Sequence, residues 1–165
     1  MSYLIKGAIA LALTVLCTYV IRGYKAYIKK RLCELSDILI LAGLIRRGVS
    51  TRLLTPRECL SSSPELESDG VRELLSYVIA GQTLCDSLAR VRRRLSLSSE
   101  SMGLISEYFS SFGCGYREDE LRLADAFIGS LSERLSLERE EAERDKRVFS
   151  GVAISITLGI IILII

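Results

Sequence analysis

The chain has 165 residues, a formal net charge of +2 and no histidine. The absence of histidine excludes a histidine base, a histidine–zinc site and a histidine-containing triad. A charge so close to zero gives little attraction for nucleic acid, and no Walker loop, dinucleotide-binding turn or nucleophile elbow occurs. Catalysis by a pair of carboxylates stays open, because general acid/base chemistry does not require histidine.

The charges are distributed unevenly along the chain. Every Asp and Glu lies between Glu34 and Asp145, and of the 22 Lys and Arg only Lys6 lies outside residues 22–147. The sequence therefore predicts a polar domain over residues 22–147 between two apolar ends.

The two apolar ends predict membrane-spanning helices. Residues 148–165, "VFSGVAISITLGIIILII", carry no charge, and as a helix they would be about 27 Å long, close to the hydrocarbon thickness of a bilayer. Residues 3–21 carry only Lys6, whose side chain can extend to the headgroups; a cleaved signal peptide is the alternative for this run.

Basic residues flank both runs on the side of the domain 22–147. Because cytoplasmic flanks of membrane helices are rich in Lys and Arg, we expect the chain to cross the membrane twice with this domain in the cytoplasm. The flanking residues are Arg22, Lys25, Lys29, Lys30 and Arg31 after the first run, and Arg144, Lys146 and Arg147 before the second.

The cysteines match none of the short spacings of metal ligands. In a reducing cytosol we expect free thiols at all five of them, Cys17, Cys33, Cys59, Cys85 and Cys114. The sequence thus predicts neither a metal site nor a bound cofactor.

The first expected helix continues from the N-terminal run. Residues 24–42 contain neither Gly nor Pro, and we expect the helix to end near Gly48. Thr55 before Pro56 then predicts a short helix with Thr55 as its N-cap, followed by a surface loop at residues 61–64. Apolar residues of the first helix recur at helical spacing, namely Leu32, Leu35, Ile38, Leu39, Ala42 and Ile45.

Three further helices are expected before residue 113. The first, which Gly81 can end, is followed by one from Thr83 to about Arg94. The third begins after Ser98 as N-cap, with Glu100 in its first turn, and stops at Gly113. The apolar stripe of the first of these helices is Val71, Leu74, Leu75, Val78 and Ile79.

The final helix shows the clearest pattern. Beyond its apolar seam, Glu140 with Arg144 and Glu143 with Arg147 are i, i+4 pairs, each expected to contribute a few tenths of a kcal/mol. With no strand-like alternation in the sequence, we predict an all-α protein, an antiparallel bundle of about six helices flanked by N- and C-terminal transmembrane helices. The seam residues are Leu121, Ala124, Ile128, Leu131 and Leu135, and the acids Glu118, Asp119 and Glu120 precede them in the first turn.

A basic cluster lies in "RVRRRL", at Arg90, Arg92, Arg93 and Arg94. One interpretation is the C-terminal turn of a short helix, where the helix dipole favours cations. The others are a site for an acidic partner protein or anionic lipid, and, last, for nucleic acid.

Residues 95–131 carry a resemblance to a known family. Leu95, Ser96, Leu97, Phe112, Gly113 and Leu131 fall at the spacing of the stage III sporulation protein AB family of endospore-forming bacteria, which this chain resembles over essentially its whole length. The chain departs from the family at three places, where Phe112 replaces a leucine, Tyr116 an aspartate and Glu120 a glutamine. Glu118 and Asp119 are candidates to take over the capping.

The stretch "IAGQTLCDSL", residues 79–88, resembles a turn in the inner-membrane platform proteins of type II secretion and type IV pilus machines, and "IRRGVSTRL", residues 45–53, is a looser second copy. In the first copy Gly81 ends one helix, Thr83 caps the next, and Leu84 and Leu88 face the core.

The resemblance implies a non-enzymatic membrane platform component of the channel between mother cell and forespore, located in the bacterial cell membrane. Its expected partners are a secretion-type ATPase of the same sporulation set, other membrane components of the channel and the lipid bilayer, but no nucleic acid; homo-oligomerisation stays open. The alternative is a membrane-anchored adaptor or regulator unrelated to secretion.

Overall fold

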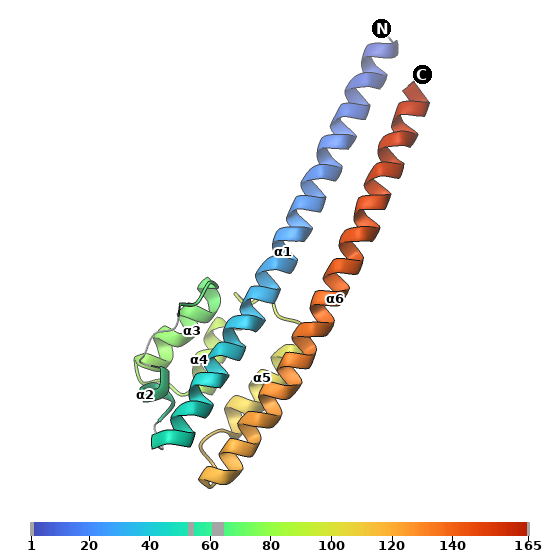
Figure 1. Cartoon of the computed structure of the whole chain (residues 1–165). Coiled ribbons are helices and arrows are strands. Elements are labelled where there is room, and N and C mark those ends of the chain that lie inside the picture. The colour runs from blue at the N-terminus through green and yellow to red at the C-terminus, as the bar shows by residue number, and fades with distance from the viewer. Residues whose placement is uncertain (1, 53–54, 61–64, 165) are drawn as a thin grey trace. The chain divides into compact units, whose positions relative to one another are not determined.

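The computed structural model describes residues 2–52, 55–60 and 65–164, in which six α-helices follow one another (Figure 1). They are α1 (Ser2–Arg52), α2 (Pro56–Leu60), α3 (Asp69–Ile79), α4 (Leu84–Val91), α5 (Ser99–Ser111) and α6 (Arg117–Ile164). No strand occurs in these stretches, so the predicted all-α class is confirmed. The loop predicted at residues 61–64 lies outside the described residues.

The chain forms two compact units, to both of which the long helices α1 and α6 contribute. One unit comprises Lys30–Glu138, and the other comprises residues 1–29 and 139–165.

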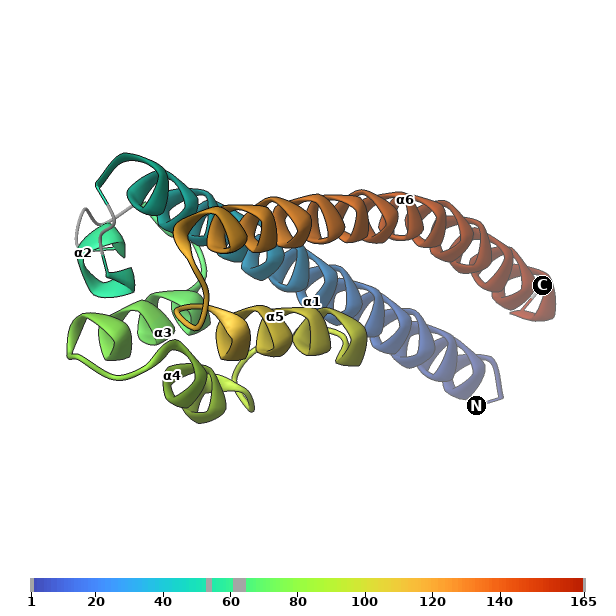
Figure 2. The same ribbon diagram turned by 90° about the horizontal axis from the view of Figure 1, so that it is seen from below.

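The unit 30–138 is built around an apolar core to which all its helices contribute. In this unit α3 packs against α2 and α4, and α4 packs against α5. Figure 2 shows α3, α4 and α5 together on one side of the C-terminal half of α1. The stripe of α1 is buried at Leu35, Ile38, Leu41, Ala42 and Ile45, an i, i+3, i+4 pattern that places these side chains on one helix face.

The seam of α6 is confirmed in its main members. Ala124, Leu131 and Leu135 are buried, while Leu121 and Ile128 are half-buried at the edge of the core. Phe127 was not expected there; its ring stacks on Tyr108 of α5 with 4.1 Å between centroids. The buried face of α6 is therefore wider than a two-residue seam, as is usual for a helix that faces a globular core.

The predicted helix starts are confirmed at three places. The Oγ1 of Thr83 accepts a hydrogen bond from the Asp86 amide at 3.1 Å, and the Oγ of Ser98 accepts one from the Ser101 amide at 3.2 Å. Thr55 and Glu58 form a reciprocal capping box at the start of α2, which satisfies amides that a helix start otherwise leaves unpaired.

The predicted end of α1 near Gly48 is wrong, because the helix continues through this position to Arg52. A Cβ on Gly48 would lie 2.0 Å from the Sγ of Cys59, so the glycine allows the close approach of α2 rather than a helix stop. The stretch 45–52 is accordingly helical throughout and is no second copy of the turn that follows α3.

In the unit formed by residues 1–29 and 139–165, the two helix segments meet at Tyr24. Its hydroxyl donates a hydrogen bond to the Asp145 carboxylate at 2.6 Å, and its ring lies 4.7 Å from that of Phe149. Within the described part of the chain, no helix is both long and apolar enough to cross a membrane.

The predicted i, i+4 ion pairs of α6 do not form. Among the described side chains, neither Glu140 and Arg144 nor Glu143 and Arg147 make an ion pair. All four are exposed, and a pair between exposed side chains contributes so little that the entropy of two free side chains can outweigh it.

Candidate functional site

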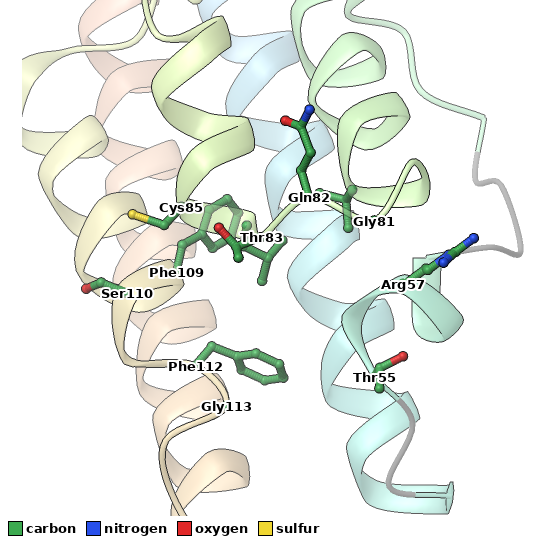
Figure 3. A pocket seen from close by; sticks show the side chains of 12 residues that line it. Thr55, Arg57, Gly81, Gln82, Thr83, Cys85, Phe109, Ser110, Phe112 and Gly113 are labelled. Carbon is green, nitrogen blue, oxygen red and sulfur yellow. The ribbon is translucent and has the colours of Figure 1, made fainter.

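A groove of about 720 Å³ opens in the unit 30–138 between the α3–α4 turn, the start of α2 and the end of α5 (Figure 3). Phe109 and Phe112 lie on one side of it, and Thr55 and Arg57 lie on the other. Its described lining is Thr55, Arg57, Val78, Gly81, Gln82, Thr83, Leu84, Cys85, Phe109, Ser110, Phe112 and Gly113.

The α3–α4 turn is shaped by Gly81. The Gln82 amide donates to the Tyr77 carbonyl at 3.1 Å and the Gly81 amide to the Val78 carbonyl at 3.0 Å, the two bonds of a Schellman motif. Gly81 has φ of +95°, a backbone conformation that residues other than glycine adopt only at a cost in free energy. Thr83 then caps α4, so the chain reverses within a few residues and leaves its glycine on the groove wall.

The end of α5 is held by an acid from the start of α6. Gly113 has φ of +90°, and the Glu120 carboxylate Oε1 accepts hydrogen bonds from the amides of Gly113 at 2.9 Å and Gly115 at 3.0 Å. Glu120, rather than the expected Glu118 or Asp119, therefore ties the turn, because it is the acid on the buried face of α6. This arrangement fixes Phe112 and Gly113 beside the groove.

The groove is apolar with a single charged residue. Val78, Leu84 and Phe109 are buried at its wall, whereas Arg57 is exposed and no acid is found among the described residues that line it. The amide oxygen of Gln82 is buried and accepts no hydrogen bond in the described structure. A site of this size and lining suits an apolar group joined to an acidic one.

The residues singled out by the family resemblance separate into two groups. Gly81, Leu84, Phe112 and Gly113 line the groove, although they come from two motifs far apart in the sequence. Leu88 and Leu131 lie in the core, and Glu120 lies beneath the turn that it holds.

The four arginines of the basic cluster also differ among themselves. Arg90 lies over the ring of Tyr77 with 5.5 Å from its guanidinium carbon to the centroid, and Arg94 pairs with Glu73 at 2.6 Å. Arg92 and Arg93 are exposed and make no ion pair in the described structure. Only these two are free for a partner or a lipid.

Two buried acids of α1 were missed by the sequence analysis. The Glu34 carboxylate accepts from the Ser96 amide at 2.6 Å, and the Asp37 carboxylate accepts from the Ser68 amide at 2.7 Å. Each acid therefore ties α1 to a chain segment just before another helix. Their signal was an acid within the apolar stripe, since Glu34 is four residues before Ile38 and Asp37 four before Leu41.

A third buried acid, Glu138, does the same from α6. Its Oε1 accepts from the Arg31 guanidinium at 2.7 Å, from Ser101 Oγ at 3.2 Å and from Ser98 Oγ at 3.3 Å. Glu138 follows Leu135 by three residues, so a charged residue stands at the next position of the apolar seam. This spacing was the sequence signal for a buried acid.

These acids bear on the carboxylate chemistry that the sequence left open. Burial raises the pKa of Glu34, although the Ser96 amide and Lys30 act in the opposite direction. Glu34, Asp37 and Glu138 do not line the groove, and each is engaged by the loop or cation described above. They act as ties between helices.

The described residues contain no group of three or more potential metal ligands, and all five cysteines are free thiols in the structure. No family model matches the chain, and neither a curated protein nor a solved structure matches it.

Proposed function

We propose that the chain is a non-enzymatic, membrane-anchored docking subunit, in which the groove lined by Gly81, Leu84 and Phe112 receives a segment of a cytoplasmic partner. The observation that carries the proposal is the gathering of these residues, from two separate sequence motifs, on one apolar groove with a single cation. The partner segment presents an apolar side chain to Phe109 and Phe112 and an acidic group to Arg57.

The membrane anchors of the proposal are residues 3–21 and 148–165. The second run has no charge, the first has only Lys6, and basic residues flank both on their inner sides. Large apolar side chains are also exposed on the described parts of these segments, at Leu11, Val15 and Leu16 of α1 and at Val152 and Ile156 of α6. Lipid would cover them, and the domain between the anchors would face the cytoplasm.

The resemblance to the stage III sporulation protein AB family supports a particular partner. In that setting the chain is a platform component of the channel between mother cell and forespore, and the segment in the groove belongs to the secretion-type ATPase of the same set. Other membrane components of the channel would contact the anchors. The second candidate, a membrane-anchored adaptor unrelated to secretion, uses the same groove for a different protein.

Site-specific photo-crosslinking in sporulating cells tests the proposal. A crosslinking residue replaces Ser110, which lines the groove, or Ser132, which is exposed on α6 away from it. We expect the Ser110 position to capture the ATPase and the Ser132 position not to. Capture of another defined protein at Ser110 alone favours the adaptor, and equal products at both positions overturn the docking role of the groove.

A further inference from the structure

Six cations surround the contact between Tyr24 and Asp145 in the unit formed by residues 1–29 and 139–165. All six are exposed, and none makes an ion pair in the structure as described. We call them the basic collar; its members are Arg22, Lys25 and Lys29 of α1 and Arg144, Lys146 and Arg147 of α6.

The contact at Tyr24 brings the two halves of the collar to one level. A helix rises about 1.5 Å per residue, so Arg22 and Lys25 lie within about 3 Å of Tyr24 along the axis of α1. Arg144 and Arg147 lie equally close to Asp145 on α6 by the same rise. Because the Tyr24 hydroxyl and the Asp145 carboxylate are 2.6 Å apart, the basic stretches of the two helices lie side by side here.

A single acid within the collar offsets only one of its six positive charges. Asp145 is the only acid in residues 22–29 and 144–147, and its carboxylate already accepts the hydrogen bond from Tyr24. The acids that sequence spacing offered as partners, Glu140 and Glu143, leave Arg144 and Arg147 unpaired, as described above. An anionic surface next to these neighbouring like charges would relieve their mutual repulsion.

Exposed apolar side chains adjoin the collar on both helices. Tyr19 is 77% exposed and Val20 57%, just before Arg22, while Val148 is 56% exposed directly after Arg147. On each helix, then, an apolar exposed surface changes to a cationic one within two residues. This succession matches the boundary between the hydrocarbon and the phosphate layer of a bilayer, where long basic side chains reach the headgroups.

We propose that the basic collar binds the phosphate groups of anionic phospholipids, so that the protein gathers these lipids around its paired anchors. The inference rests on the proposed membrane anchoring and names the lipid class that the anchors select. Neutral phospholipids fit less well, because the choline group brings a positive charge into the same layer. The attraction is electrostatic, so it weakens as ionic strength rises.

The test uses the full chain in bilayers of phosphatidylcholine mixed with phosphatidylglycerol. After mild extraction, mass spectrometry measures the ratio of the two lipids that remain bound. We expect the wild type to retain phosphatidylglycerol in preference to phosphatidylcholine. In the Arg144→Gln, Arg147→Gln double variant the ratio of bound phosphatidylglycerol to phosphatidylcholine should fall by a factor of about five or more. The matched control is the Arg47→Gln, Arg122→Gln double variant, which also removes two exposed arginines and should keep the wild-type ratio.

Other outcomes overturn the inference in distinguishable ways. If the chain enters the bilayer but retains both lipids in proportion to their supply, the collar has no preference and the lipid inference alone fails. The same holds if the two double variants change the ratio equally. If the chain does not enter the mixed bilayer, the anchoring in the proposed function fails together with the lipid inference.

Discussion

The two units of the molecule differ in the contacts that stabilise each of them internally. The unit 30–138 buries whole side chains such as Leu35, Ile105 and Leu131. Its buried acids Glu34 and Asp37 each tie α1 to a loop through a hydrogen bond. The unit formed by residues 1–29 and 139–165 has the Tyr24 contact but exposes most of its large described apolar side chains. The first unit carries its own core, whereas the second leaves most of its large described apolar side chains exposed. The proposed function therefore gives docking to the first unit and anchoring to the second.

The largest expected effect tests whether the core holds the unit 30–138. Leu131 is 0% exposed, so Leu131→Ala should lower the free energy of unfolding by about 2–5 kcal/mol, through lost apolar burial and the remaining cavity. Leu137 on the same helix is 45% exposed, and Leu137→Ala should change the free energy of unfolding by less than about 0.5 kcal/mol. Denaturant unfolding of the full chain in detergent measures both; equal losses would show that the seam of α6 is not the core.

A smaller effect is expected at the turn between α5 and α6. Gly113→Ala places a side chain at φ of +90° and should cost about 1 kcal/mol or more. Gly103 lies within α5 with open space around it, so Gly103→Ala should instead stabilise the protein by about 0.5–1 kcal/mol. The same unfolding measurement compares the two variants, and an unaffected Gly113→Ala protein would mean that the turn does not need its glycine.

The pH dependence of stability tests the buried acid of α1. Burial raises the pKa of Glu34 above its ordinary value of 4.5. The folded state of the wild type is therefore most stable, as far as this group is concerned, at pH values below 4.5, where the carboxyl is protonated in both the folded and the unfolded state. Its contribution is lost as the pH rises through the raised pKa. Glu34→Gln should therefore gain stability relative to wild type between acid and neutral pH. Glu133→Gln, at an exposed position, is the control, and parallel curves for both variants would contradict a buried charge at Glu34.

The smallest effect is expected from the free arginines after α4. Arg92→Gln with Arg93→Gln should leave the unfolding free energy within about 0.5 kcal/mol of wild type, because both side chains are exposed. Arg94→Gln breaks the pair with Glu73 and should cost up to about 1 kcal/mol, since Arg94 is itself largely exposed. Thermal unfolding ranks them, and a larger loss in the double variant would give Arg92 or Arg93 a structural role.

Much of the fold of the unit 30–138 was predictable from local signals. The caps at Thr83 and Ser98, the turns at Gly81 and Gly113, and the seam through Leu131 depend on residue type and spacing within one or two helical turns. The prediction at Gly48 was wrong because a glycine is needed there for the close contact with Cys59, eleven residues away in the chain. Helix-breaking propensity does not reveal such a contact.

The groove was predictable only in part. The motifs containing Gly81 and Phe112 each marked a turn, but their meeting depends on the packing of α4 against α5. The role of Glu120 was missed for a related reason, since all three acids of the first turn look alike in the sequence and only the rotation of α6 selects one.

Two cysteines allow a direct test of the central claim that a groove on the cytoplasmic side of a membrane-anchored protein holds a partner. Cys85 lines the groove and Cys114 lies in the α5–α6 turn outside it, and both are exposed. Burial, together with a hydrogen bond to Glu67, raises the pKa of Cys33 to about 11, and Cys59 is buried, so these two thiols should react little with a maleimide.

The measurement is labelling with a membrane-impermeant maleimide, located by peptide mass spectrometry. In intact sporulating cells we expect neither Cys85 nor Cys114 to be labelled. In inverted membrane vesicles that retain the partner only Cys114 should react, and after peripheral proteins are stripped Cys85 should react as well. Labelling in intact cells, or labelling of Cys85 that does not change when the partner is removed, would contradict the account.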